Sequence, residues 1–472
     1  MITHKLGYKT GLKGLVLTAF LSMVSVGAYA ADGAPVLDTG NTAWIITSTV
    51  LVLLMSIPGI ALFYGGLVRQ KNVLSLIMQT LFIVGVVSLL WVIFGYSWAF
   101  GTGFAESGNP LGALIGGFDK CFLNGITVDS VESSGIPTYT WVMFQCMFAL
   151  ITPALILGAF AERIKFKGYM IFIILWVIVA YFPMAHWVWG GGFLQQMGAI
   201  DFAGGTVVHI NAGVSALVMA LMIGKREDYR VGHPIIPHNI TLVFMGTCFL
   251  WLGWFGFNPG STMSFQNPSD VMHILMTTNS SAIAAVMTST ITAWIFIGKP
   301  DLGMTINGCL AGLVGVTASC AYVTVGASLL IGAIAGIIVV FAVMFFDRIG
   351  IDDPVGATSV HLCCGVFGTI CVGLFAKEGV TSLSTKNGLF YGGGFGLLGV
   401  QLLGIVAVGA FVFAASMLVW FVLKKTVGIR VPAEEEIAGL DIGEHGNRAY
   451  PDFAPAVDSV DYSAVDTLAV AA

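Results

Sequence analysis

Long apolar runs recur along the chain between Ala43 and Leu423, and short polar segments separate them. Each run approaches the roughly twenty residues that an α-helix needs to cross the hydrocarbon core of a bilayer. The pattern therefore predicts an all-α polytopic membrane protein with eleven transmembrane helices. The expected spans are 42–66, 73–99, 139–161, 169–189, 204–223, 238–257, 272–297, 303–321, 326–346, 356–375 and 394–423.

The N-terminal apolar run differs from the others. Lysines precede a short run at 15–26, which ends at the small-x-small sequence AYA (28–30). This order is typical of a secretory signal peptide. An uncleaved first span is the alternative, but the run is short and the polar stretch ADGAPVLDTGNT follows it directly. We expect residues 1–30 to be a cleaved signal peptide and the mature N-terminus to lie outside.

The basic residues are distributed unevenly between the loops. With the N-terminus outside, one set of loops contains Arg69, Lys71, Arg163, Lys165, Lys167, Lys225, Arg226, Arg230, Lys299 and Arg348, and the tail on that side begins with Lys424, Lys425 and Arg430. The opposite loops contain Lys120, Lys377 and Lys386. Because Lys and Arg gather on the cytoplasmic side of membrane proteins, we expect the tail at 424–472 to be cytoplasmic. The composition, with 10% charged residues against about 25% in soluble proteins, agrees with a membrane protein.

Two distant segments of the chain are alike. GGTVVHINAG (204–213) and GATSVHLCCG (356–365) share Thr206/Thr358, Val208/Val360, His209/His361 and Gly213/Gly365. The segments fall in the fifth and tenth spans, so two halves of five spans each would have opposite orientations in the membrane. Inverted repeats of this kind place binding sites near the bilayer midplane, between the halves. We therefore expect an inverted 5+5 repeat plus a final helix, with the two histidines facing each other.

Ionisable side chains at bilayer depth are costly and tend to line pathways. The candidates are His186, Asp201, His209, His361 and the pair Asp352-Asp353. A lone histidine is as easily a core group bonded to backbone. Two neutral imidazoles can also satisfy each other, since each has one donor and one acceptor nitrogen.

A metal site and an enzyme are both disfavoured. A zinc site would need a third ligand, and the consecutive Cys363 and Cys364 point in different directions on a helix. No nucleophile–base pair emerges from the sequence either. We expect no metal, no cofactor, no enzymatic activity and no nucleic-acid partner.

Aromatic residues gather at the outer ends of three spans. They lie in MFQCMFALI (143–151), MAHWVWGGGF (184–193) and GWFGFNPGS (253–261). Such residues form interfacial belts in membrane proteins. They also form cation–π sites that attract small cations. The composition alone does not favour one of these interpretations over the other.

Several motifs together resemble those of the Amt/Mep/Rh ammonium transporters, in particular the bacterial Amt branch. They are AHWVWG, DFAGGTVVHINAG, GWFGFNPGS, LAGLVGVTA, DDPVGATSVH and EEEIAGLDIGEHGNRAY. The resemblance runs from about Asn41 to Tyr450. It implies a membrane domain at 31–423 and a cytoplasmic regulatory tail at 424–472.

The resemblance also implies roles for individual residues. Trp189, Phe148 and Ser261 would bind ammonium or methylammonium at the outer mouth, and Phe148 and Phe257 would form a stacked gate beneath them. His209, His361 and Trp254 would line the pore, while Asp201 would anchor the site without touching substrate. Some members carry an aspartate four or five residues before the second histidine, where this chain has Gly356 and Ala357, and this leaves the pore histidine unaffected.

The implied function is transport of ammonium through an apolar pore. An ion of this size pays on the order of 20 kcal/mol to enter a low-dielectric medium, so NH4+ would give up its proton and cross as NH3, with or without that proton. The alternative is an ammonium sensor that signals through its tail, although a tail of this length cannot hold a fused signalling domain. A membrane enzyme is the less favoured rival.

The resemblance extends to partners and location. It implies a homotrimer in the inner membrane and a PII-type signalling protein that binds the tail at 431–450. The run Glu434-Glu435-Glu436 and the glycines Gly439 and Gly443, expected at turns, predict an ordered, docked segment.

Overall fold

The computed structural model describes residues 35–233 and 235–451. The predicted signal peptide at 1–30 and the last part of the tail lie outside the described residues. Within the described residues the secondary structure is helical, apart from isolated β-bridges at Val131–Pro137 and Ile164–Arg430. The predicted all-α fold is confirmed.

The helices follow the predicted order. The first half contains α2 (Thr39–Leu54), α3 (Ile60–Leu67), α4 (Val73–Leu90), α5 (Tyr96–Phe100), α6 (Gly103–Glu106), α7 (Thr138–Ile156), α8 (Phe166–Trp176), α9 (Phe182–Trp189), α10 (Phe193–Gln196), η8 (Gly205–Ile210) and α11 (Asn211–Ile223). The second half contains α12 (Glu227–Arg230), α13 (Ile240–Gly260), α14 (Pro268–Ile297), α15 (Leu302–Thr317), α16 (Val325–Arg348), η9 (Thr358–Cys363), α17 (Cys364–Phe375) and α18 (Gly396–Thr426). The tail adds α19 (Ala433–Ala438) and α20 (Leu440–Gly443).

Ten helical segments of the described chain are long and apolar enough to cross a bilayer. The eleventh expected span, 303–321, is the shorter helix α15, with 16 residues. At 1.5 Å per residue it is about 24 Å long, less than the roughly 30 Å of a hydrocarbon core. The predicted set of eleven helices is therefore present, and one of them is short.

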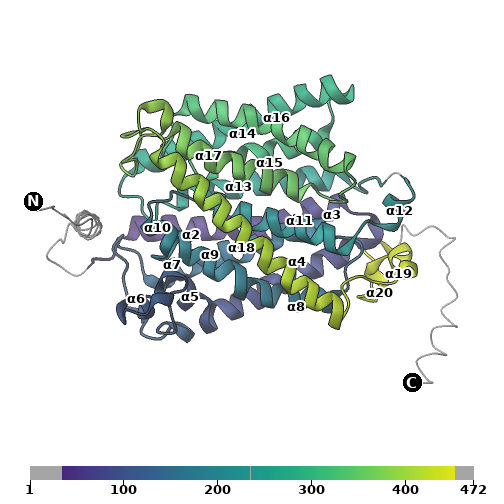
Figure 1. Cartoon of the computed structure of the whole chain (residues 1–472), viewed down its shortest axis with the longest axis horizontal. Coiled ribbons are helices and arrows are strands. Elements are labelled where there is room, and N and C mark those ends of the chain that lie inside the picture. The colour runs from purple at the N-terminus through teal and green to yellow at the C-terminus, as the bar shows by residue number, and fades with distance from the viewer. Residues whose placement is uncertain (1–34, 234, 452–472) are drawn as a thin grey trace, which may run out of the picture. The chain divides into compact units, whose positions relative to one another are not determined.

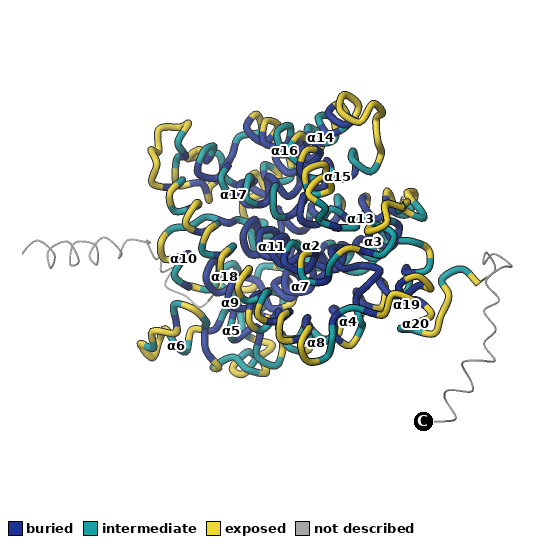
Figure 2. The backbone as a smooth tube through the Cα atoms, turned by 45° about the vertical axis from the view of Figure 1, so that its right-hand side comes forward, coloured by how far each residue is buried: buried dark blue, intermediate teal, exposed yellow. Residues whose placement is uncertain are grey.

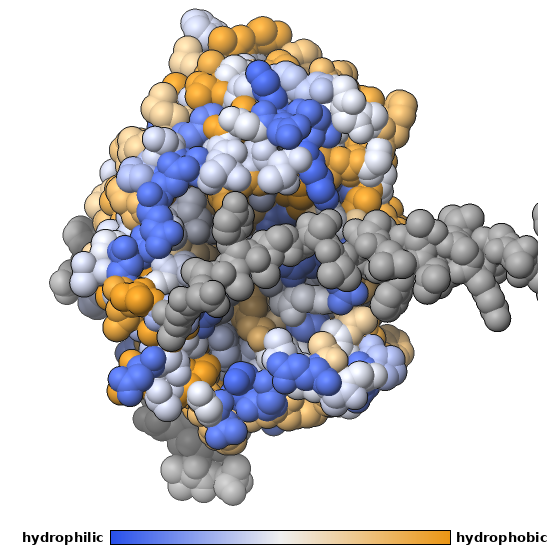
Figure 3. Space-filling model, turned by 90° about the vertical axis from the view of Figure 1, so that its left-hand side faces the viewer, coloured by the Kyte–Doolittle hydropathy of each residue, from blue (hydrophilic) through white to orange (hydrophobic). Residues whose placement is uncertain are grey.

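The two halves pack around a buried centre. Helices α14 to α17 lie together in Figure 1, α4, α8 and α9 lie on the other side, and α18 crosses diagonally between them. Helix α18 packs on α8, α11 and α17 and so contacts both halves. Figure 2 shows α7 and α11 mostly buried, whereas α18 carries exposed stretches. Figure 3 shows the end of the bundle that carries α6 and α10, and this face has hydrophilic side chains with apolar ones gathered along its edges.

The two histidine segments pack reciprocally. Segment η8 lies against α17, and η9 lies against α11. A Cβ on Gly213 would come within 2.2 Å of the Leu362 amide nitrogen, and one on Gly365 would lie 3.1 Å from the Cβ of His209. Each shared glycine therefore lets its helix approach the opposite histidine segment. This exchange of equivalent contacts is what an inverted repeat predicts.

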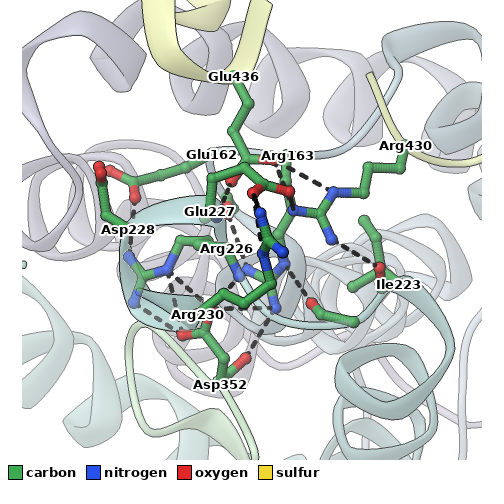
Figure 4. A network of polar contacts seen from close by, with 12 residues as sticks. Glu162, Arg163, Ile223, Arg226, Glu227, Asp228, Arg230, Asp352, Arg430 and Glu436 are labelled. Atoms are coloured by element: carbon green, nitrogen blue, oxygen red, sulfur yellow. Dashed lines mark hydrogen bonds and ion pairs between the residues drawn. The ribbon is translucent and has the colours of Figure 1, made fainter. Parts of the chain in front are cut away.

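A buried ion-pair network joins the loops at one end of the bundle (Figure 4). Arg226 forms ion pairs at 2.8 Å with both Glu162 and Asp352, and Arg69 pairs with Glu162 at 3.0 Å. Burial alone would raise the pKa of Glu162, but Arg226 and Arg69 outweigh it and hold the pKa at about 2. Arg163 is fully buried and donates to the Asp352 carbonyl oxygen at 2.7 Å. Basic residues that indicate topology in the sequence thus also hold the loops together.

The same network reaches the tail. Arg430 pairs with Glu436 at 2.7 Å and with Glu227 at 3.3 Å, and the Glu227 amide donates to Glu436 at 2.7 Å. Glu436 is 1% exposed, and its carboxylate pairs with Arg430 inside the protein. Figure 4 shows Glu436 and Arg430 on segments that close over the loop residues.

The next turn of the tail is anchored on α4. The Leu440 amide donates to Asn72 Oδ1 at 2.9 Å, and Asp441 Oδ1 accepts from the Ser75 amide at 2.8 Å. Gly439 has a φ of +109°, and a Cβ there would come within 2.6 Å of Lys71 Cβ, so glycine is required at this turn. Gly443 was expected at a turn as well, but it is the last helical residue of α20. That second expectation is wrong.

Candidate functional site

Three aromatic side chains from three helices meet near the C-terminal end of α9. The rings of Phe148 (α7) and Phe257 (α13) are stacked, with centroids 4.3 Å apart and planes at 30°. Trp189, the last residue of α9, meets Phe148 edge-to-face at 5.7 Å and 88°. Phe148 and Phe257 are buried, whereas Trp189 is partly exposed. The Trp189 indole therefore lies against a stacked pair of phenylalanine rings that is closed to solvent.

Hydrogen bonds fix the surroundings of these rings. The Trp189 indole donates from Nε1 to the backbone oxygen of Asp201 at 2.8 Å. Ser261, the C-cap of α13, donates its hydroxyl to the Phe257 carbonyl oxygen at 2.8 Å. Because the Ser261 proton is committed to that carbonyl, the hydroxyl lone pairs are left to accept from another group.

Asp201 organises the start of the first histidine segment. Its Oδ1 accepts from the amides of Gly204 (2.9 Å) and Gly205 (2.6 Å). Its Oδ2 accepts from the Thr206 amide (2.7 Å) and hydroxyl (2.5 Å) and from the Val207 amide (3.2 Å). The first amides of a helix have no partner within the helix, and this carboxylate supplies one. Its position fits the expected anchor.

A narrow cavity lies next to the phenylalanine pair. It is lined by Phe257, Trp254, His209, His361 and apolar side chains, and the centre of a water-sized molecule can reach about 20 Å³ of it. Roughly 10–15 Å³ on this measure holds one water, so the cavity admits a molecule of that size and excludes a hydrated ion. The structure thus brings both histidines and Trp254 to one space.

The two imidazoles are close but not hydrogen-bonded. Their centroids are 5.3 Å apart and their planes differ by 9°, and the ring of Trp254 lies 5.6 Å from His209. Neither nitrogen of His209, and not Nδ1 of His361, has a hydrogen-bond partner in the described chain. The prediction that the imidazoles satisfy each other is therefore wrong. The packing of η8 and η9 through Gly213 and Gly365 sets the distance between the two backbones.

The acidic pair at the start of η9 divides into two roles. Asp352 belongs to the ion-pair network, whereas Asp353 Oδ2 accepts from the Thr358 amide at 2.7 Å. Asp353 precedes His361 by the same eight positions that separate Asp201 from His209. Asp353 is therefore the counterpart of Asp201, a match that sequence reasoning missed although the equal spacing could have revealed it. Within residues 35–233 and 235–451, Oδ1 of Asp353 has no hydrogen-bond partner.

Comparison with known proteins identifies the group to which this site belongs. The model of the Ammonium Transporter Family matches residues 43–450. The chain belongs to the ammonium transporter family. This family consists of transporters, not enzymes.

The relatives agree with this assignment. An ammonium transporter of Bacillus subtilis is 40% identical over 418 residues, which cover 88% of this chain and 100% of that protein. The ammonium transporter Amt1 of Archaeoglobus fulgidus is 36% identical, with coverages of 88% and 100%. Among solved structures, Mep2 of Candida albicans superposes with a TM-score of 0.77 at 33% identity, covering 88% of this chain and 91% of that one. A protein described as a sensor Amt protein also gives a TM-score of 0.77, at 32% identity, with coverages of 86% and 98%.

Proposed function

We propose that this ammonium transporter binds NH4+ at Trp189, Phe148 and Ser261, removes its proton, and conducts NH3 past the gate at Phe148 and Phe257. The proton either is taken up by water at the mouth or moves separately by way of His209 and His361. The observation that carries the proposal is the buried His209, which lines a mostly apolar cavity together with His361 and whose nitrogens have no partner in the described part of the chain. Buried polar groups are nearly always hydrogen-bonded, so unpaired ones indicate a transient partner. NH3 both donates and accepts and is of the size that the cavity admits.

The apolar walls of the pore favour passage of the neutral NH3 molecule over an ion. A bare cation in a low-dielectric space loses on the order of 20 kcal/mol of solvation before compensation. Aromatic faces at the mouth offset a small part of this cost for NH4+ before it gives up its proton. K+ binds aromatic faces too, but it has no proton to lose. Selectivity would therefore come from deprotonation.

Replacing Trp189 with leucine tests the outer site. We expect the concentration for half-maximal methylammonium uptake to rise about tenfold, because one cation–π face of ~1.4 kcal/mol is lost. The maximal rate should change little. The control is Trp294→Leu, since Trp294 lies on an exposed part of α14. An unaltered concentration dependence in Trp189→Leu would remove the recruitment role.

We further propose that the protein is a homotrimer of the inner membrane, with the mature N-terminus outside and the tail in the cytoplasm. The clustering of the arginine network and the docked tail at one end of the bundle supports this orientation. A PII-type protein would bind the tail there. Glu434 and Ile437 are exposed on the docked segment and so are open to a partner.

Variants of the exposed tail surface test the PII proposal. We expect Glu434→Lys combined with Ile437→Asp to abolish co-purification with a PII protein while leaving uptake intact, because neither residue belongs to the buried contacts. Deleting 431–450 should abolish co-purification as well. It should also disturb the loops, since Arg430 and Glu227 would lose Glu436. If both variants still capture the PII protein, the tail is not its binding site.

A sensor remains the second candidate function, because one similar structure is described as a sensor Amt protein. Purified protein in liposomes separates the two functions. A transporter carries labelled methylammonium into the vesicles, whereas a pure sensor binds it without uptake.

A further inference from the structure

His186 is a buried histidine that the pore does not use. It lies one turn before Trp189 on α9 and is 2% exposed. Its Nδ1 contacts the carbonyl oxygen of Ala99 at 3.1 Å, and its Nε2 contacts that of Gly112 at 2.9 Å. Carbonyl oxygens only accept, so a neutral ring donates to one of the two and the imidazolium form donates to both. The side chain lies between Ala99 of α5 and Gly112 of the loop that follows α5, and it joins the end of α9 to this region.

Neighbouring residues make separate contacts with the same region. The Trp187 indole donates to the Leu114 carbonyl oxygen at 3.1 Å. A Cβ on Gly190 would lie 1.8 Å from the Ala99 oxygen and 2.8 Å from His186 Nδ1. The backbone of α5 therefore touches the end of α9 directly, and only glycine fits between them. Figure 1 shows α5 and α9 side by side, with α6 of the outer loop next to α5.

The hydrogen bonds at the C-terminal end of α9 position Trp189. One restraint is its own bond to the Asp201 carbonyl oxygen at 2.8 Å. The backbone oxygen of His186 also accepts from the amides of Gly190 (3.0 Å) and Gly192 (2.9 Å), which closes the helix immediately after Trp189. The side chain of His186 ties the same turn to Ala99 and Gly112. The indole is therefore set from two sides.

We propose that His186 is a positioning residue for ammonium capture: it fixes the end of α9 against Ala99 and Gly112 and thereby holds the Trp189 indole over Phe148. The proposal rests on the recruitment role proposed for Trp189. A purely structural histidine would stabilise the fold without acting through Trp189. A double-mutant cycle separates the two, because residues that act through one another have non-additive effects.

The experiment measures half-saturation and maximal rate of methylammonium uptake in liposomes. His186→Phe keeps an aromatic ring, somewhat larger than imidazole, and removes both ring nitrogens, and His186→Gln keeps an amide group that can donate. We expect half-saturation to rise about tenfold in His186→Phe and less in His186→Gln, with maximal rates within about twofold of the unmodified protein. In a Trp189→Leu background neither change should raise half-saturation further. Trp187→Phe is the matched control, since it removes one bond to the same loop, and we expect it to leave half-saturation unchanged.

The outcomes are distinct. Unchanged half-saturation in both His186 variants, or effects that add to those of Trp189→Leu, would overturn the positioning role while leaving recruitment by Trp189 in place. An equal rise in Trp187→Phe would also overturn it, because general loosening of the loop would then suffice. If Trp189→Leu alone has no effect, both the recruitment role of Trp189 and the positioning role of His186 are wrong. Should His186→Phe not reach the membrane, the cycle with His186→Gln decides.

Discussion

Replacing His209 with alanine is expected to reduce the ammonium-evoked current of purified protein in lipid bilayers by at least about tenfold, and to create a K+ current absent from the unmodified protein. The substitution removes the unpaired nitrogens that NH3 and a released proton would use. It also widens the cavity where Trp254 and His361 face His209. A wider lumen admits water and hydrated cations.

Variants at the same position make this test specific. His209→Glu should retain part of the ammonium current and remain closed to K+, because a carboxylic acid fills the space and also carries a proton. The matched control is His273→Ala, since His273 contacts the Val323 carbonyl oxygen at 2.9 Å and does not line the cavity. If His209→Ala kept the ammonium current and the selectivity of the unmodified protein, His209 and His361 would be core residues without a role in transport.

The stability of the His209 variant should change little beyond the cost of the cavity. If His209 shared a hydrogen bond with His361, removing His209 would leave His361 unpaired and lower the stability of the fold by about 1–3 kcal/mol. The structure contains no such bond, since both nitrogens of His209 are unpaired. Loss of function without a large fall in unfolding temperature is therefore expected.

The sequence predicts the helices well because their signal is local. Span length follows from the runs of apolar residues along the chain, and the shared Gly213 and Gly365 have the close contacts that a repeat requires. The end of α15 was predicted too late, at 321, because apolarity continues past Thr317, where the helix itself ends. Hydropathy measures solubility in lipid, and it does not measure where a backbone leaves the helix.

The site is predicted less completely because side-chain geometry is not local. The resemblance names Phe148, Trp189 and Phe257, and the structure shows them in contact, but their roles stay predictions. The separation of His209 and His361 depends on how η8 and η9 pack, which no pattern of residues reveals. The same is true of Arg226, which counts as a topology signal in the sequence and proves to be buried between Glu162 and Asp352.

Replacing Asp201 with alanine is expected to have the largest effect on stability. The carboxylate accepts from the amides of Gly204, Gly205, Thr206 and Val207, and alanine leaves them without a partner. Each buried group left unpaired costs about 1–3 kcal/mol, so the sum is a large part of the roughly 5–15 kcal/mol that stabilises a typical domain. The unfolding temperature in detergent should fall by on the order of 10 °C, or the protein should fail to accumulate.

The counterpart aspartate is a control within the same chain. Asp353 caps η9 through the Thr358 amide, and its Oδ1 has no partner in the described part of the chain. Asp353→Ala should therefore lower the unfolding temperature less than Asp201→Ala. Asp201→Asn keeps one acceptor oxygen and should lie between Asp201→Ala and the unmodified protein. The Trp189 bond goes to the backbone of Asp201 and is available in every variant, so any protein that folds should still capture methylammonium. Equal losses of stability in Asp201→Ala and Asp353→Ala would show that the number of capped amides does not decide the outcome.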